Sequence, residues 1–330
     1  MLSKLGEAQI DLTSEARNQL LTSVTDLFLL DPNPSATSKE HFGEIAVDTV
    51  AELKDEYRRA FSERVAAVPV LPHKVAMALG GDVNPEVARA VLMMSPVLTD
   101  ADLAAFALSQ SQQHLAAIAD RAVLSEQITS VLVSRGDEVV LQRVSGNEGA
   151  RFSDPGFNEL LARGGEDPAV ATNLALRSDM SSERMDRVLK VVQVLTEGGK
   201  AGPFATQAMQ QRLEIGMLLQ DLAAGKRKID DVVTMLAQEG RAYHLSQAIA
   251  QGSKVGVEKI LRALMQRDAA GIGVACKAVD LSPVAFREVA LFRERRLRVT
   301  AKTVDEDAAA YAKLTRESAE SAMFALRRRT

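Results

Sequence analysis

Apolar residues recur three and four positions apart along most of this chain, the spacing that predicts amphipathic α-helices. Between residues 69 and 197 the pattern also repeats, because an apolar residue and then a Ser, Thr or Pro precede each predicted helix. These start positions are Pro72, Thr99, Ser125, Ser153 and Ser181, and they lie 27, 26, 28 and 28 residues apart. Ser and Thr side chains cap helix N-termini by accepting a backbone N–H hydrogen bond, and Pro suits the first turn.

A second, shorter helix is predicted after each of these helices. The stretches "EVARAVLM", "HLAAIAD", "DEVVLQRV" and "AVATNLAL" follow turns such as "GGDVNPE" and "SRGDE". A single hairpin of about 27 residues cannot bury its apolar face, whereas stacked hairpins can. We therefore expect an all-α solenoid of stacked helical-hairpin repeats over residues 69–197. The alternative is a non-repetitive helical bundle with similar turns.

Residues 1–68 depart from this repeat and are expected to form an N-terminal helical cap. The first helix should start at Thr13 or Ser14 and cover the end of the stack. Residues 39–68 predict one long helix or a kinked pair. The apolar residues expected to cover the end of the stack are Leu20, Leu21, Val24, Leu27 and Phe28.

After residue 197 the repeat fades, and "TEGGKAGPF" is the best boundary in the chain. Residues 198–300 are expected to form a C-terminal helical region. Residues 301–330 read as a single helix or tail. From residue 286 onward eleven Lys and Arg stand against seven Asp and Glu. This excess favours self-association through the C-terminal helices or contact with an acidic partner, and the alternative is a solvated helix face.

Composition places the chain among folded, water-soluble proteins, with 46% hydrophobic and 25% charged residues. The net charge of −4 counts against nucleic-acid binding, which requires a basic surface. No apolar run is long enough for a membrane span, and the first residues do not have the pattern of a signal peptide. A cytoplasmic location is therefore expected.

Residues that carry chemistry are few and scattered. The histidines His41, His73, His114 and His244 lack the spacing of a metal site on one helix, and "GIGVAC" lacks the third glycine of a dinucleotide loop. Cys276 reads as a buried apolar residue rather than a reactive thiol. The acidic pairs Glu166–Asp167, Asp230–Asp231 and Glu306–Asp307 are expected at helix starts. We therefore expect no catalytic residue, no metal and no cofactor.

The densest polar group lies in "RGDEVVLQRVSGNEGARFS", residues 135–153. One interpretation is a network that joins the turns of adjacent repeats. The other is a binding site for a partner peptide or an anion, in which Arg143 and Arg151 act as forked donors. The candidate binding residues are Arg135, Arg143, Asn147 and Arg151.

Several phrases make the chain resemble a bacterial family known as domain of unknown function 2336. They are "NPEVARAVLMMSPVLTDADL", "RGDEVVLQRVSGNEGARFS" and "LALRSDMSSERM", within a resemblance that covers roughly residues 14–195 and continues more loosely to about 298. The resemblance implies helical proteins with HEAT-like repeats. It brings no catalytic residues.

These observations favour a non-catalytic protein-interaction scaffold, such as a bacterial signalling or regulatory adaptor, with a protein as its partner. The alternative is a binder of nucleic acid or of a nucleotide-like anion along a basic groove. An enzyme with a site assembled from distant residues is a third hypothesis, which no motif supports.

Overall fold

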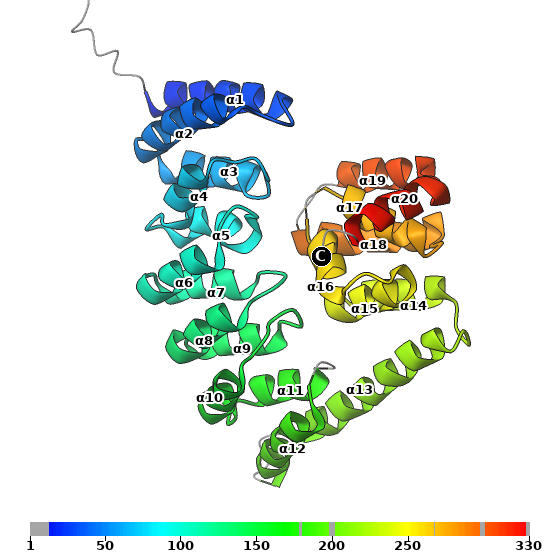
Figure 1. Cartoon of the computed structure of the whole chain (residues 1–330). Helices are drawn as coiled ribbons and strands as arrows, with labels where there is room; N and C mark the ends of the chain where they lie inside the picture. Colours follow the sequence, from blue (N-terminus) through cyan, green and yellow to red (C-terminus); the bar gives the residue numbers. More distant parts are fainter. Residues whose placement is uncertain (1–12, 178–179, 198–201, 267, 298–300, 328–330) are drawn as a thin grey trace, which may run out of the picture. The chain divides into compact units, whose positions relative to one another are not determined.

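The protein is all-α in the ranges that the computed structural model describes, residues 13–177, 180–197, 202–266, 268–297 and 301–327. Twenty α-helices lie in these ranges, and most contacts between them join helices one or two places apart in the chain (Figure 1). The described residues contain no β-strand, only an isolated parallel bridge between Leu124 and Ala150. The predicted fold class is confirmed at this level.

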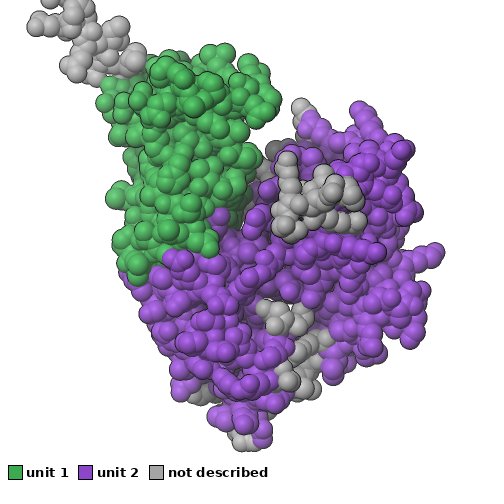
Figure 2. Space-filling view, viewed as in Figure 1, with its two compact units in different colours: residues 1–118 green, residues 119–330 purple. Residues whose placement is uncertain are grey.

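The chain divides into two compact units, residues 1–118 and 119–330 (Figure 2). In unit 1, α1 contacts α2, and α2 contacts α4. Helix α5 contacts both α3 and α4. The helices of unit 1 are α1 (Ser14–Leu30), α2 (Ala36–Ala51), α3 (Asp55–Val65), α4 (His73–Gly80), α5 (Pro85–Met94), α6 (Asp100–Ser109) and α7 (Gln112–Ala119), which ends at the boundary.

Unit 2 begins with two pairs of helices, in which α8 contacts α10 and α9 contacts α11. The long helix α13 then contacts α11, α14 and α15. The helices of unit 2 are α8 (Glu126–Arg135), α9 (Glu138–Gly146), α10 (Asp154–Gly164), α11 (Pro168–Leu176), α12 (Ser182–Glu197), α13 (Gly202–Ala223), α14 (Ile229–Gln238), α15 (Ala242–Ser253), α16 (Val257–Leu264), α17 (Ala270–Ala278), α18 (Pro283–Leu297), α19 (Ala301–Lys313) and α20 (Arg316–Arg327). The division of the chain into segments 1–68, 69–197, 198–300 and 301–330 remains a prediction.

All five predicted start positions immediately precede a helix. Pro72 lies before α4 and makes no side-chain cap. The four hydroxyl side chains each accept a backbone N–H hydrogen bond from the first turn, as an N-cap does. The donors are Asp102 to Thr99 at 3.2 Å, Ile128 to Ser125 at 3.4 Å, Gly156 to Ser153 at 3.2 Å and Arg184 to Ser181 at 3.3 Å.

The N-terminal helices follow the prediction in part. Thr13 caps α1 by accepting from the backbone N–H of Ala16, and residues 39–68 contain a break rather than one long helix, because α2 ends before α3 begins. Leu21 and Phe28 are buried, but Leu20 is 48% and Leu27 is 69% exposed. The expectation that all five apolar side chains cover the stack is wrong, because α1 packs against α2 along a narrower stripe.

The single helix predicted over residues 301–330 is also wrong. Two helices, α19 and α20, lie there, and they contact α18 and α17 respectively. The chain turns at Leu314, and Thr315 caps α20 by accepting from the backbone N–H of Ser318 at 3.2 Å. An apolar periodicity that continues through a cap residue predicts one helix where the chain forms two.

The boundary predicted at "TEGGKAGPF" cannot be compared in full, because its centre, residues 198–201, lies outside the described residues.

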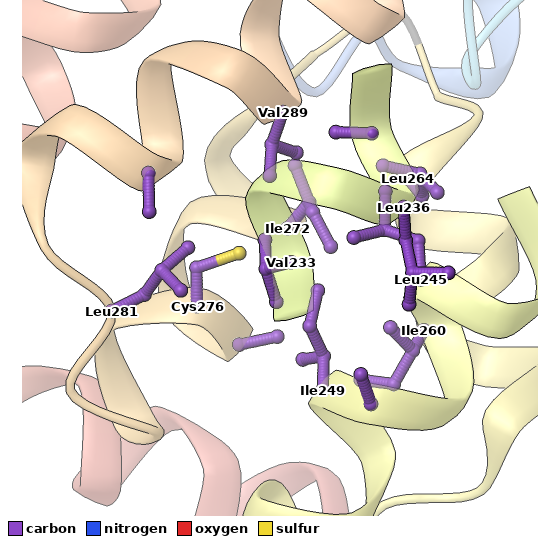
Figure 3. Packing of buried hydrophobic residues seen from close by; sticks show 14 of the residues in the cluster. Val233, Leu236, Leu245, Ile249, Ile260, Leu264, Ile272, Cys276, Leu281 and Val289 are labelled. Atoms are coloured by element: carbon purple, nitrogen blue, oxygen red, sulfur yellow. The ribbon is translucent and has the colours of Figure 1, made fainter. Parts of the chain in front are cut away.

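A core of aliphatic side chains fills unit 2 between α14, α15, α16, α17 and α18 (Figure 3). Val233, Leu245 and Ile272 are fully buried at its centre, together with Cys276. Burial raises the pKa of the Cys276 thiol far above its ordinary value, so the thiolate does not form at neutral pH. The prediction of a buried apolar cysteine is confirmed.

Polar side chains link turns that lie about one hairpin apart. Arg163 donates to the carbonyl oxygens of Ser134 and Gly136 at 2.7 and 2.9 Å, at the C-terminal end of α8. In unit 1, Gln110 donates to the carbonyl oxygen of Gly81 at 3.3 Å. These bonds satisfy carbonyl groups that a helix end leaves without an intrahelical partner.

Candidate functional site

The turn between α9 and α10 is held in place by Asn147. Its buried side chain donates to the carbonyl oxygens of Ala119 and Arg121 at 2.8 and 2.6 Å, and accepts from the backbone N–H of Gly149 at 2.9 Å. A Cβ on Gly149 would lie 1.9 Å from the carbonyl oxygen of Ala122, so only glycine allows this approach. The turn therefore packs directly against the backbone that precedes α8.

Arg177 holds the same turn from its other side. Arg177 is 3% exposed, and its guanidinium donates to the carbonyl oxygens of Asn147 and Ala150, both at 2.6 Å. It also lies over the ring of Phe152, 5.1 Å from the ring centroid, a cation–π contact. These contacts place a positive charge beside the turn.

Glu148 connects the turn to α15. One carboxylate oxygen accepts from the backbone N–H of Tyr243 at 2.8 Å, and the other lies 2.9 Å from Nδ1 of the buried His244. Burial raises the pKa of Glu148, but His244, this N–H group and the charge of Arg241 outweigh it and hold the pKa below its ordinary value. Glu148 is therefore ionised at neutral pH.

A pocket of about 180 Å³ lies where these segments meet, and we call it the turn pocket. Its walls come from the α9–α10 turn, the end of α11, the α14–α15 turn, α16 and the last turn of α18. The lining residues are Ala122, Gly146, Asn147, Glu148, Gly149, Asn173, Leu176, Arg177, Gly240, Arg241, Ala242, Tyr243, Leu261, Met265 and Arg296.

The turn pocket carries more positive than negative charge, because Arg177, Arg241 and Arg296 line it with Glu148 as the one acidic residue. Arg241 donates to Glu239 at 2.8 Å and to Gln211 at 3.4 Å. Arg296 is exposed and has no hydrogen bond or ion pair within the described part of the chain. Such a lining suits an anion, since one guanidinium group can donate two parallel hydrogen bonds to a carboxylate or phosphate.

Of the four predicted binding residues, only Asn147 lines the turn pocket. Arg143 pairs with Asp120 and Arg151 pairs with Glu258 on α16. Arg135 is exposed in the last turn of α8. The structure thus does not bring the four together at one place, and the binding role assigned to each stays a prediction.

The prediction did not include the pocket arginines Arg177, Arg241 and Arg296. The sequence gives a weak indication that Arg177 lies near Asn147, since the two residues are 30 positions apart, about one hairpin. Arg241 and Arg296 carry none, because nothing in their surroundings indicates that the α14–α15 turn folds back on the α9–α10 turn. Only long-range packing places them there.

Two of the three acidic pairs lie at helix starts, as expected, and the third does not. Asp167 caps α11 and Asp230 lies in the first turn of α14, as predicted. The expected helix-start position of Glu306–Asp307 is wrong, because both lie inside α19. Asp307 there pairs with the buried Arg293, Nη1 to Oδ2 at 3.2 Å, and burial raises the pKa of Asp307 against the opposing charge of Arg293.

The ranges described above lack two further features, a cluster of metal-ligating side chains and a helix able to span a membrane. They hold no group of three or more His, Cys, Asp or Glu side chains arranged to bind a metal ion. No helix within them combines the length and the apolar character that crossing a membrane requires. The turn pocket is accordingly the candidate site that the geometry defines.

The fold and the pocket define an all-α protein with an anion-suited site between helix turns. The model of a family described as "uncharacterised protein conserved in bacteria", domain of unknown function 2336, matches residues 87–324. The match covers more than half of the chain, so the chain belongs to this family. The family is as predicted, but the match begins later and ends nearer the C-terminus than the resemblance indicated. Neither the curated proteins nor the solved structures gave a match.

Proposed function

We propose that this chain is a non-catalytic protein-interaction scaffold built from HEAT-like helical hairpins, and that it serves as a signalling or regulatory adaptor in bacteria. The observation that carries the proposal is the constant offset of the side-chain links between turns. Asn147 reaches Ala119 across 28 residues, Arg163 reaches Gly136 across 27 and Asn173 reaches Ser145 across 28. Stacked hairpins of one length account for this offset.

Two links after residue 197 have offsets close to this one. Arg293 donates to the carbonyl oxygen of Leu264 across 29 residues, and Tyr311 donates to that of Leu281 across 30. Stacks of this kind present long surfaces for partners without deep catalytic clefts. A protein partner is therefore the interpretation that accounts best for the architecture.

A test of the scaffold starts from the tagged full chain and the proteins it retains from a bacterial lysate. The affinity of a purified partner is then measured for Leu30→Asp, Leu108→Asp and Val284→Asp, which change exposed apolar residues on three different helices. A partner that contacts an extended surface should lose affinity with more than one of them. Ser23→Asp on the exposed side of α1 is the matched control. Finding no saturable partner, or one that all three changes leave unaffected, contradicts the proposal.

Self-association through the C-terminal helices is proposed as a further partner interaction. Multi-angle light scattering of the full chain should then give a mass above 35.6 kDa that rises with concentration. A mass that stays at one chain over the accessible concentrations contradicts it.

The second candidate function is binding of nucleic acid or of a nucleotide-like anion along a basic groove. The three arginines of the turn pocket favour the anion part of this hypothesis. The net charge of −4 favours a local contact over binding along a whole nucleic-acid strand.

A further inference from the structure

We propose that the turn pocket binds a small organic molecule that carries one phosphate or carboxylate group, and that Arg296 and Arg241 hold this oxyanion. The inference rests on the second candidate function above and narrows it to a small ligand at a defined place.

The donors for the oxyanion come from two arginines at the rim. Arg296 is exposed on the last turn of α18 and has no partner in the described ranges. Arg241 engages its Nε and Nη2 with Glu239 and Gln211, and Nη1 has no hydrogen bond to any described residue. An oxyanion between them meets planar donors with unused N–H groups, which is the geometry that favours guanidinium binding.

The charge around these donors also favours an anion. Arg177 is occupied with two carbonyl oxygens, so it supplies positive charge to the pocket. The opposing carboxylate of Glu148 is engaged by the backbone N–H of Tyr243 and lies against His244. The turn pocket therefore has a net positive lining in a partly enclosed place, where electrostatic attraction is stronger than in open water.

The remaining walls determine the body of the ligand. Leu176, Leu261 and Met265 form an apolar side, and Tyr243 adds an aromatic ring. The volume of about 180 Å³ is below the range of roughly 300–1,000 Å³ that accommodates drug-sized ligands. A single ring or a short chain attached to the oxyanion fits this space, whereas a nucleic-acid strand does not.

Isothermal titration calorimetry of the full chain tests the inference with phenyl phosphate as the probe. The wild type should bind, and Arg296→Gln should weaken binding about tenfold, the loss expected for a charged hydrogen bond. Arg287→Gln removes an equal charge from the same helix, at an exposed residue outside the pocket lining, and should change affinity by less than about twofold. Arg296 has no partner to lose, so circular dichroism of the variant should match the wild type.

Parallel titrations identify the source of the oxyanion. Binding of phenyl phosphate but not of benzoate indicates a phosphorylated ligand, and the reverse indicates a carboxylate. Weaker binding of inorganic phosphate supports the role of the apolar wall.

Two results overturn the inference. One is that the wild type binds neither phenyl phosphate nor benzoate, and the other is that Arg296→Gln and Arg287→Gln bind equally well. A labelled oligonucleotide that binds in an Arg296-dependent way, with no binding of either small probe, overturns the small ligand but retains the broader anion-binding function.

Discussion

Arg177 shows how a single buried side chain can hold a turn in place. It donates to the carbonyl oxygens of Asn147 and Ala150, and almost none of its surface is exposed. Hydrogen bonds of a charged donor contribute more than neutral ones, and a buried carbonyl that loses its donor costs additional free energy. Residues such as this one therefore determine stability more than the many exposed ion pairs.

Replacing Arg177 with Met is expected to lower the free energy of unfolding by about 2–4 kcal/mol, because two buried carbonyl groups lose their charged donor. Urea unfolding followed by circular dichroism measures this. Arg59→Met is the matched control, since Arg59 is exposed and pairs with the exposed Glu63 four residues away, and it should change stability by about 0.5 kcal/mol or less. Equal losses for the two variants contradict the role given to Arg177.

Glu148 is expected to make stability depend on pH in the acid range. Its folded-state pKa lies below the ordinary value of 4.5, so the ionised carboxylate stabilises the fold. That contribution is complete above the unfolded-state pKa and is lost as the pH falls through the folded-state pKa. The stability difference between wild type and Glu148→Gln should therefore shrink as the pH falls below 4.5.

Urea titrations over a pH series measure this difference. Glu126→Gln changes an exposed carboxylate in the first turn of α8 and serves as the control. A wild-type–Glu148→Gln difference that stays constant through the acid range contradicts the assignment.

Among the helices, starts are defined by local hydrogen bonds. Thr99 and Asp102 form a capping box, in which each side chain accepts from the backbone N–H of the other. Burial raises the pKa of Asp102, but hydrogen bonds from His73 and from Thr99 hold it below its ordinary value. Caps of this kind are formed within four residues, which is why sequence spacing located the four helix starts that a Ser or Thr side chain caps.

Thr99→Ala is expected to destabilise unit 1 by about 1–2 kcal/mol, because the first turn of α6 loses its acceptor. Hydrogen exchange should increase at the first amides of α6. Thr22→Ala, at an exposed position inside α1, should be neutral or slightly stabilising by about 0.3–0.7 kcal/mol, since Ala has the higher helix propensity. A larger loss of stability in Thr22→Ala than in Thr99→Ala would contradict this reasoning.

Contacts between helices and turns depend on the space between them, as two glycines show. Gly149→Ala places a Cβ against the carbonyl oxygen of Ala122 and should cost about 1–3 kcal/mol through overpacking. Gly216 lies inside α13, where an added Cβ would meet only open space, so Gly216→Ala should stabilise by about 0.5–1 kcal/mol. Thermal unfolding separates the two, and a loss in Gly216→Ala as large as in Gly149→Ala refutes the reasoning.

The chain forms two compact units, and several side-chain links join residues that lie 27 to 30 positions apart. In a stack, stability is approximately a sum of terms for each hairpin and for each interface between neighbours. A change in one interface should therefore be felt locally. In a bundle with one shared core, the same change should weaken every helix of the unit.

Gly149→Ala distinguishes these two architectures by hydrogen exchange measured along unit 2. A stack predicts faster exchange in α8 to α11 and in the contacting α16, with α19 and α20 unchanged. Uniformly faster exchange in all helices of unit 2 would instead support the bundle.

Local sequence was enough to specify the helical class, the helix starts at Thr99, Ser125, Ser153 and Ser181, and the buried state of Cys276. These properties depend on capping, periodicity and polarity, which act over a few residues. The break at Thr315, the exposure of Leu27 and the turn pocket depend instead on how the helices pack. Arg241 and Arg296 meet Asn147 and Arg177 only because α14 to α18 pack back against the α9–α10 turn. Such contacts join residues about a hundred positions apart, and no local preference specifies which of many apolar faces will meet.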